Sequence, residues 1–470
     1  MKRIAIIGGG ISGLSAAFAL EKERVRGTEI EYVIFESGTR FGGVIQTERL
    51  DGCLLEAGPD SFLTEKPWAA DLCRELGLGD QLIGSNDAQR KTGMLVNGRL
   101  VPIPDGLMFM VPTRLAPTFF SPLFSWHTKL RIVREWFFRP QPNDADSSAA
   151  AFVERHYGRE MVERIADPLL SGVYGGSADE LSVQSVLPRF IAMEASYGSL
   201  GKAMVAARKH HLSRGAALFT SLKNGMQQMV DAQVARIPAI AHRLNAKVDA
   251  VKPESGKWLV ISNGRTEEFD AAILSAPAFA AAACLQTANK ELARELGAIS
   301  YSSSVTVSLG FDQKVRAALP AGFGFLLPRT EKRRTLAVTF VHNKFRHRAP
   351  EDRALIRCFL GGTRDAAILA NSDDEIQSIV RGELQSILGI EAEPLFIRIH
   401  RWSDSMAQYS VGHSSRIARA KEILSQTPGL ALAGNAYGGI GVPDCVRSGS
   451  EAASKVLKEL AVAPRAQSVG

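Results

Sequence analysis

The first forty residues change from a strand pattern to a helical pattern and back. Residues 2–7 form a short apolar run that ends in glycines, and residues 11–20 are small and apolar with helical spacing. Residues 29–35 then alternate and finish in β-branched and aromatic side chains, which is typical of a strand. This order predicts strand, tight turn, helix and strand, a β-α-β unit of ordinary length.

The next part of the chain predicts a helical insertion. Residues 101–140 are rich in prolines and aromatic residues, and nearly all of their charges are basic. Residues 141–150 are small and polar, which predicts a loop. Residues 151–212 follow a mostly helical pattern, with Pro168 and Pro188 as breakers.

The second half of the chain predicts mainly strands. A turn at Asn224-Gly225 leads into a helix that reaches residue 240. The predicted strands are 247–251, 258–262, 271–274, 305–311, 324–327, 335–340, 356–360 and 430–433. A glycine-rich loop over 434–441 and a helix over 446–460 follow, and 461–470 is expected to be a loose tail. The strands between 305 and 360 predict a second sheet.

Length and composition indicate a folded protein of two or three domains. The 470 residues exceed one ordinary core, and 45% hydrophobic with 22% charged residues is the balance of a globular chain. The net charge of +7 would attract anions. The sequence has no lysine-rich tail and no nucleic-acid-binding motif, so nucleic acid is not expected as a partner.

The cysteines and the N-terminus favour the cytoplasm. The cysteines are far apart and form no CxxC pair, which fits a reducing compartment and predicts no zinc site. They are Cys53, Cys73, Cys284, Cys358 and Cys445. The first strand begins at residue 2 and leaves no room for a leader, and no apolar run reaches about 18 residues. We therefore expect a cytoplasmic protein without a membrane span and without a metal site.

A glycine motif stands between the first strand and the first helix. Gly8, Gly10 and Gly13 fit G-x-G-x-x-G, in which the first permits a tight turn, the second lets backbone approach a pyrophosphate and the third lets helix and strand pack closely. The phosphates would lie on the helix N-terminus, next to Ile11 and Ser12, where free N–H groups favour negative charge. Alone, the motif also fits a glycine-rich turn without a nucleotide.

The residues after the second strand favour FAD over NAD. Glu36 lies at the end of that strand, where a carboxylate binds ribose hydroxyls and repels the 2′-phosphate of NADP. With Ser37, Arg40, Gly42 and Gly43 it gives E-x-x-x-R-x-G-G, which resembles the flavoprotein oxidase superfamily that includes the monoamine oxidases. Arg40 can neutralise pyrophosphate charge, and the two glycines let backbone approach the cofactor.

A third segment, residues 433–442, resembles the C-terminal flavin-contacting segment of the same superfamily. It has the sequence AGNAYGGIGV and precedes a predicted helix. The resemblance implies flavin contacts from Gly434, Asn435, Gly441 and Val442, and from Val248 in the predicted strand 247–251. The cofactor is therefore expected to be FAD.

Motifs in the middle of the chain narrow the resemblance. FVERHYG at 152–158, DPLLSGVYGG at 167–176, FGFLLP at 323–328 and FLGG at 359–362 are similar to segments of the oxygen-dependent protoporphyrinogen oxidases, in the same order. The likeness runs from about residue 3 to residue 460. It implies FAD-dependent six-electron oxidation of protoporphyrinogen IX to protoporphyrin IX in heme biosynthesis, with O2 as acceptor and hydrogen peroxide as by-product.

The resemblance also implies a substrate slot. Leu326 and Phe359 fall where the family's ring-sandwiching residues lie, Thr339 where plant members carry a second sandwiching leucine, and Gly172 where a backbone carbonyl faces the pyrrole N–H groups. The arginine that pairs with a propionate in eukaryotic members is replaced here by Thr92, so Arg90 and Lys91 beside it become the expected anchors. The flavin carries the chemistry, and no side chain is expected to be catalytic.

The expected architecture is α/β with a discontinuous Rossmann-like FAD-binding domain. That domain takes residues 1–85, 215–298 and 420–465. A mixed-sheet substrate-binding domain takes 299–419 with part of 86–104, and a mostly helical, membrane-contacting domain takes 105–214. The expected partners are the porphyrinogen and O2. The apolar and basic mixture of 101–140 predicts peripheral contact with the cytoplasmic membrane, and a homodimer is kept as an open alternative.

Other readings stay open at this point. Some bacterial members of the family oxidise coproporphyrinogen III, which carries two more propionates. Flavin amine oxidases and carotenoid desaturases share the N-terminal motifs without the central ones. Escort proteins of prenylated GTPases share the fold without flavin chemistry, and the complete nucleotide motifs argue against them.

Overall fold

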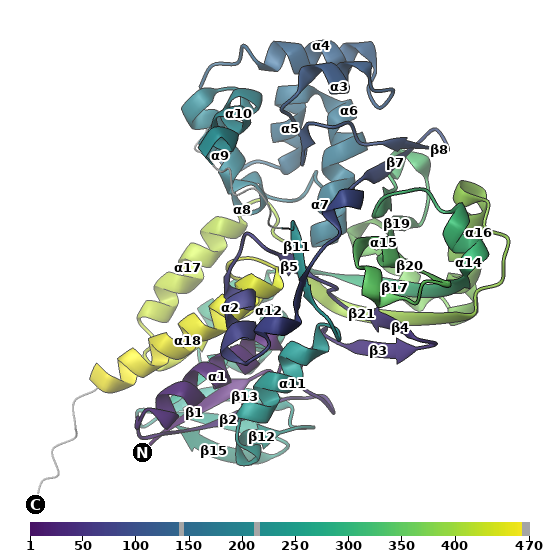
Figure 1. Cartoon of the computed structure of the whole chain (residues 1–470). Coiled ribbons are helices and arrows are strands. Elements are labelled where there is room, and N and C mark those ends of the chain that lie inside the picture. Colours follow the sequence, from purple (N-terminus) through teal and green to yellow (C-terminus); the bar gives the residue numbers. More distant parts are fainter. Residues whose placement is uncertain (141–144, 211–216, 463–470) are drawn as a thin grey trace, which may run out of the picture.

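The N-terminal unit folds as its pattern predicts. The computed structural model describes residues 1–140, 145–210 and 217–462 (Figure 1). It contains β1 (Lys2–Ile7), α1 (Ile11–Val25) and β2 (Ile30–Phe35). Both strands are buried over most of their length, because helices cover both faces of a parallel sheet.

Three distant parts of the chain build one parallel sheet. Its strand order is β12-β2-β1-β16-β22. The added strands are β12 (His242–Arg243), β16 (Ala271–Leu274) and β22 (Leu430–Leu432). α18 (Val442–Val462) lies along α1 (Figure 1). The two helices approach closely because Gly449 has no side chain; a Cβ there would overlap the carbonyl group of Ser12.

Smaller elements surround this sheet. An antiparallel sheet consists of β13 (Val248–Glu254), β14 (Lys257–Ser262) and β15 (Arg265–Phe269). A hairpin consists of β3 (Thr47–Leu50) and β4 (Cys53–Glu56), and another small sheet of β5 (Phe62–Leu63), β11 (Phe219–Leu222) and β6 (Leu82–Gly84). The helices here are α2 (Trp68–Glu75), α11 (Gln227–Arg236), α12 (Ala278–Leu285), α13 (Lys290–Gly297) and α17 (His413–Ser425).

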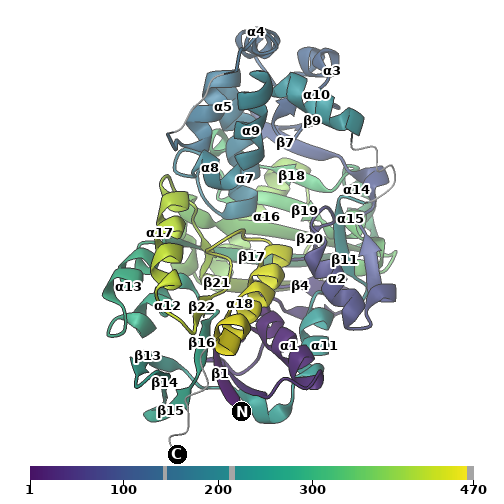
Figure 2. The same ribbon diagram turned by 90° about the vertical axis from the view of Figure 1, so that its left-hand side faces the viewer.

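A mixed sheet forms the second layer of the molecule (Figure 2). Its order is β21-β17-β20-β19-β18-β7-β8, with β18 and β7 parallel and the other pairs antiparallel. The strands are β21 (Phe396–Ala407), β17 (Tyr301–Asp312), β20 (Arg353–Gly361), β19 (Thr335–Phe340), β18 (Gly324–Leu326), β7 (Thr92–Val96) and β8 (Arg99–Pro102). One face packs its apolar residues against α16 (Asp373–Leu388). α14 (Gln313–Ala318) and α15 (Val341–Lys344) lie at its side.

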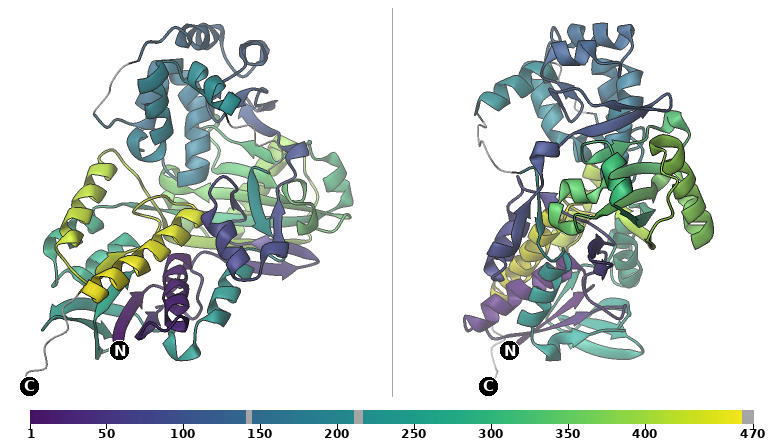
Figure 3. Two further views of the ribbon diagram at one scale, coloured as in Figure 1. Left: turned by 60° about the vertical axis from the view of Figure 1, so that its left-hand side comes forward. Right: turned by 45° about the vertical axis from the view of Figure 1, so that its right-hand side comes forward.

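A helical part stands beyond the mixed sheet (Figures 1 and 3). Its elements are β9 (Leu107–Met108), β10 (Val111–Pro112), α3 (Leu115–Phe120), α4 (Trp126–Glu135), α5 (Ala149–Tyr157), α6 (Arg159–Met161), α7 (Asp167–Tyr174), α8 (Val183–Val186), α9 (Pro188–Tyr197) and α10 (Leu200–His210). α7 contacts β18 and β19. This helix therefore joins the helical part to the mixed sheet.

Pro188 begins a helix as predicted, but Pro168 does not end one. A π-helical turn, Val162–Ala166, connects α6 directly to α7, in which Pro168 is among the first residues. Proline has no N–H to donate to the preceding turn, and a π-helical bulge is one of the ways in which a helix accommodates that loss. The prediction of a break at Pro168 was therefore wrong.

Buried charges hold the helical part together. His156 on α5 lies between two carboxylates, 3.3 Å from Glu135 on α4 and 3.1 Å from Glu194 on α9. Arg155 also donates to Glu194, and Ser199 to Glu135. Burial alone would lower the pKa of His156, but the hydrogen bonds and charges of the two carboxylates outweigh it and raise that pKa.

We predict that this cluster makes the stability of the helical part depend on pH. A histidine whose pKa is raised by folding stabilises the folded state fully below its unfolded pKa of about 6.5, and this contribution is lost as pH rises through the higher folded pKa. Thermal unfolding of the wild type should therefore occur at lower temperature as the pH rises above neutral. His156→Gln should remove that part of the pH dependence, and an unchanged pH profile in this variant would contradict the prediction.

Candidate active site

The glycine motif forms the tight turn between β1 and α1. Gly8 has a φ of +111°, a conformation that favours glycine. A Cβ at Gly13 would overlap the carbonyl oxygen of Gly8, so helix and strand can pack only with glycine there. Gly10 differs from both, because its backbone is extended and a Cβ would meet no atom within 4 Å.

The start of α1 fits an anionic ligand. Gly10 is the N-cap, no side chain of the described residues caps the helix, and its first turn contains no acidic residue. Free N–H groups at Ile11 and Ser12 and the helix dipole attract negative charge. The open space over Gly10 lies at this helix end, so the turn fits the pyrophosphate of a dinucleotide.

Glu36 lies directly beside this turn. Its carboxylate accepts from the N–H groups of Gly9, at 2.8 Å, and Gly38, at 2.7 Å, and Ser37 is within 3.4 Å. Each carboxylate oxygen can accept two hydrogen bonds. Oε2 accepts only from Gly9 among the described residues, so it remains able to bind a ribose hydroxyl. The backbone of Ala246 donates to the Glu36 carbonyl, and this pairing brings the strand that starts at the buried Val248 to the same place.

The loop after Glu36 folds over the glycine turn. The Gly42 N–H donates to the Gly9 carbonyl at 2.8 Å, and a Cβ at Gly43 would lie 3.4 Å from Gly10. Arg40 donates to the carbonyl groups of Phe41, Ile45 and Gly43, and burial lowers its pKa. In this arrangement Arg40 holds the loop in place, and its contact with pyrophosphate stays a prediction.

Tyr409 fixes the C-terminal glycine segment, and the sequence motifs did not indicate it. Its hydroxyl donates to the Asn435 carbonyl at 2.7 Å and accepts from the Gly439 N–H at 2.8 Å. Burial raises the pKa of Tyr409, so the hydroxyl stays protonated. Gly434 has a φ of +138°, and Gly441 immediately precedes α18, whose first residue is Val442. The glycine segment therefore ends at the start of α18, where Gly441 and Val442 are predicted to contact the flavin.

Predicted substrate residues lie on one face of the mixed sheet. Leu326 pairs with Ala337, and Ala337 pairs with Phe359, so strand register places all three side chains on the same face. Leu326 and Phe359 are half-buried. A Cβ at Gly172 on α7 would be 3.9 Å from Leu326, so the helix faces this row. Thr339 occupies the neighbouring row.

Arg90 and Lys91 lie at the edge of the same sheet with exposed side chains. The Lys91 carbonyl accepts from the Phe323 N–H at 2.8 Å, and the Arg90 guanidinium is 3.7 Å from Asp87. Among the described residues, no hydrogen bond or ion pair holds either side chain toward the row of Leu326 and Phe359. Their role as propionate anchors stays a prediction.

The Ala57-Gly58 peptide connects the two layers. The Ala57 carbonyl accepts from Thr306 and from Trp402, each at 2.8 Å, and from Arg357 at 3.1 Å. A Cβ at Gly58 would overlap the carbonyl group of Val44, next to Gly43. The peptide therefore lies between the glycine loop that contains Gly42 and Gly43 and the mixed sheet, where it contacts strands β17, β20 and β21.

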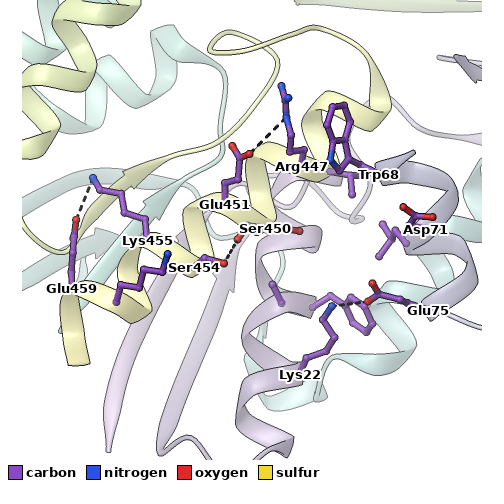
Figure 4. A pocket seen from close by; sticks show the side chains of 15 residues that line it. Lys22, Trp68, Asp71, Glu75, Arg447, Ser450, Glu451, Ser454, Lys455 and Glu459 are labelled. Atoms are coloured by element: carbon purple, nitrogen blue, oxygen red, sulfur yellow. Dashed lines mark hydrogen bonds and ion pairs between the residues drawn. The ribbon is translucent and has the colours of Figure 1, made fainter. Parts of the chain in front are cut away.

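A groove on the FAD-binding side of the molecule lies away from these residues. It has a volume of about 800 Å³ and is lined by residues of α1, α2 and α18, with Trp68 at one end (Figure 4). Its charges pair with each other: Lys22 is 2.6 Å from Glu75 and Lys455 is 3.6 Å from Glu459. Because none of the predicted site residues lines it, we do not place the active site there.

Comparison with known proteins agrees with this geometry. A model of flavin-containing amine oxidoreductases matches residues 11–457. The chain is 34% identical to coproporphyrinogen III oxidase of Bacillus subtilis (strain 168), over 98% of each chain. It is 27% identical to protoporphyrinogen oxidase 2 of Arabidopsis thaliana, over 98% of this chain and 94% of the relative.

Solved structures show the same fold. A crystal structure of a provisionally assigned protoporphyrinogen oxidase from Exiguobacterium sp. 255-15 is 31% identical with a TM-score of 0.87, covering 98% of this chain and 99% of that one. Cyclohexylamine oxidase from Brevibacterium oxydans IH-35A superposes with a TM-score of 0.71 at 18% identity, over 98% and 99% of the two chains, which shows the fold alone. This chain belongs to the flavin-containing amine oxidoreductase family, and its cofactor is FAD.

Proposed function

We propose that this protein is a porphyrinogen oxidase of heme biosynthesis that passes the electrons of its substrate through FAD to O2. The observation that carries the proposal is the row of Leu326, Ala337 and Phe359 facing Gly172. An apolar wall opposite a helix position that has no side chain suits a large flat ring. Coproporphyrinogen III oxidases and a protoporphyrinogen oxidase among the relatives support this substrate class.

The residues of the chain bind and orient while the cofactor supplies the redox chemistry. FAD accepts hydride when bound. Phe359 and Leu326 would hold the substrate ring against one face, and their apolar surface would exclude water from it. Gly172 lies in the last turn of α7, where carbonyl groups lack helical partners and can accept from pyrrole N–H groups. The parallel sheet would hold FAD and the mixed sheet the substrate.

Coproporphyrinogen III is the substrate we place first. The sequence motifs alone favoured protoporphyrinogen IX. However, the relatives at 32–34% identity are named coproporphyrinogen III oxidase, whereas the Arabidopsis protoporphyrinogen oxidase is 27% identical. The two porphyrinogens differ in two propionates, so the choice depends on how many cations meet the carboxylates at the slot.

We predict that the protein oxidises coproporphyrinogen III with a higher kcat/KM than protoporphyrinogen IX. A hydrogen bond to a charged group contributes about 1.5–3 kcal/mol, so each lost propionate contact should lower kcat/KM roughly ten- to a hundredfold. Porphyrin fluorescence during aerobic turnover of each substrate measures this. Equal values would leave the two substrates undistinguished and contradict the preference, and oxidation of neither would defeat the proposed function.

We also propose that the helical part contacts a membrane surface. Large apolar side chains on and beside α3 and α4 are exposed: Phe120 at 82%, Phe137 at 78%, Trp126 at 66% and Leu130 at 64%. These residues are therefore not the core of the helical part, which contains Phe124 and Ile132 instead. No helix in the described ranges is long and apolar enough to span a bilayer. A mixture of exposed apolar and basic residues suits contact with lipid headgroups.

Flotation with liposomes tests the membrane contact. We expect binding that increases with anionic lipid, because each basic residue near such a surface contributes about 1 kcal/mol. Arg131 and Arg134 are exposed on α4, and changing both to Glu should abolish flotation while porphyrinogen oxidation in solution continues. Absence of flotation by the active wild type at low salt would contradict this proposal.

A further inference from the structure

Arg357 is a buried cation inside an apolar strand. It lies on β20 between Ile356 and Cys358 and is 3% exposed. Its Nη2 donates to the Ala57 and Gly58 carbonyl groups, and its guanidinium carbon is 4.7 Å from the ring centroid of Phe359. Its Nε atom is buried and has no hydrogen-bond partner. Neutral carbonyls and an aromatic face thus bind the guanidinium, but they do not neutralise it.

The neighbouring charges leave Arg357 without an ion pair. Asp60 is 2.9 Å from the ammonium group of Lys344, and Glu56 is 2.6 Å from Arg348. These two pairs cancel, and no carboxylate oxygen of the described residues forms an ion pair with Arg357. Burial, opposed by the charges of Asp60 and Glu56, lowers the pKa of Arg357. The junction therefore carries one uncompensated positive charge.

The position of this charge connects the two binding sites. On one side the guanidinium donates to the Gly58 carbonyl, and Gly58 packs against Val44, next to Gly43 in the loop that follows Glu36. On the other side it lies over Phe359, the predicted wall of the substrate slot. A buried charge interacts more strongly with its surroundings than an exposed one, because water does not screen it. An anion that forms at this junction would compensate Arg357.

We propose that Arg357 is a positioning residue whose positive charge favours reduction of the flavin. In each two-electron oxidation a C–H bond of a methylene bridge would break, its electrons and hydrogen would go to bound FAD as hydride, and the substrate would lose an N–H proton. The hydride would add negative charge to the cofactor, and O2 would then take up the two electrons with that hydrogen and one proton, giving hydrogen peroxide. Preorganised charge next to a site where charge develops is a common source of stabilisation in enzymes. This inference rests on the FAD assignment and deepens the proposed function.

The test measures the flavin itself in purified holoenzyme, without porphyrinogen. Arg357→Met removes the charge, Arg357→Lys retains it, and Arg398→Met is the matched control. Arg398 lies in the same register row, since both arginines pair with Ser308, but it is half-exposed and 2.9 Å from Glu48. Equilibrium reduction against a reference dye gives the midpoint potential of the flavin. Sulfite adds to oxidised flavin as an anion, so an absorbance titration gives its dissociation constant as an independent measure.

We expect Arg357→Met to shift the reduction equilibrium toward the oxidised form about tenfold, equivalent to about 30 mV for a two-electron couple. Its dissociation constant for sulfite should rise roughly tenfold as well, because both probes report charge near the flavin. Arg357→Lys should restore most of both values, and Arg398→Met should match the wild type. FAD content and melting temperature show whether Arg357→Met is folded. If it is not, the charged Arg357→Lys and the neutral Arg357→Gln are compared instead.

Two outcomes would overturn the inference. One is that fully FAD-loaded Arg357→Met has a reduction equilibrium constant and a sulfite dissociation constant that both lie within twofold of the wild-type values. The other is an increase in KM for porphyrinogen without any change in potential, which would make Arg357 a carboxylate-binding residue instead. Neither measurement on the flavin depends on the identity of the porphyrinogen, so failure of the proposed substrate and failure of this inference can be told apart.

Discussion

Gly10→Val is expected to lower FAD occupancy strongly without unfolding the protein. The backbone of Gly10 is extended, with φ −72° and ψ −179°, a conformation that valine adopts readily. No protein atom lies within 4 Å of the added Cβ, so the side chain would fill only the space at the start of α1 that fits the pyrophosphate. We expect at least roughly a tenfold loss of FAD occupancy, since a buried clash at the phosphates removes their close backbone contacts.

Absorbance of the purified variant, together with its circular dichroism, separates cofactor loss from misfolding. Gly382→Val on α16 is the matched control, because a Cβ there also meets nothing within 4 Å and the site is far from the glycine motif in sequence. Glu36→Ala should lower FAD affinity as well, through lost ribose hydrogen bonds. Full flavin content in both Gly10→Val and Glu36→Ala would show that the nucleotide lies elsewhere.

The sequence could predict strands that are mostly apolar or that alternate regularly. β1, β2, β16, β19 and β20 are buried over most of their length, and β2 was predicted from its alternation and the others from apolar or β-like runs. β21 was missed because its twelve residues, Phe396–Ala407, are mostly half-buried and contain arginines, histidine and serines. It borders the sheet, and an edge strand needs no continuous apolar pattern. β15 was missed for the same reason.

The candidate site could be predicted only where it rests on local motifs. Gly8, Gly13 and Glu36 lie within one β-α-β unit, so their spacing determines their geometry. Tyr409 reaches the C-terminal glycine segment from the end of β21, and no local pattern indicates such a contact. One signal was available for Arg357, because a lone cation within the apolar run of β20 must have a reason to be buried.

The register between neighbouring strands could not be predicted from the sequence either. Leu326 and Phe359 were singled out by motif, but their position on one face follows from the intervening Ala337, which pairs with both. Sequence pattern defines which residues of a strand share a face, and it does not define which strands are neighbours. The parallel contact of β18 with β7 is an example, since these strands are separated by more than two hundred residues.

Phe359→Ala is expected to reduce turnover strongly while leaving FAD in place. The ring is half-buried on the proposed substrate face and contacts the guanidinium group of Arg357, whereas the predicted FAD contacts lie at the parallel sheet. Removing a stacked aromatic surface costs about 3 kcal/mol, which corresponds to roughly a hundredfold in kcat/KM. Steady-state kinetics with either porphyrinogen, at measured flavin content, tests this expectation.

Two further variants make the result specific to the slot. Phe359→Leu retains apolar volume and should recover much of the activity, while Leu326→Asp should lose as much as Phe359→Ala, because it places a charge opposite Gly172. Cys358→Ala is the control on the opposite face of β20, where the side chain is fully buried against α16, so it should lower stability more than kcat/KM. If Phe359→Ala and Leu326→Asp both turn over substrate at the wild-type rate, the porphyrinogen does not bind on this face of the mixed sheet.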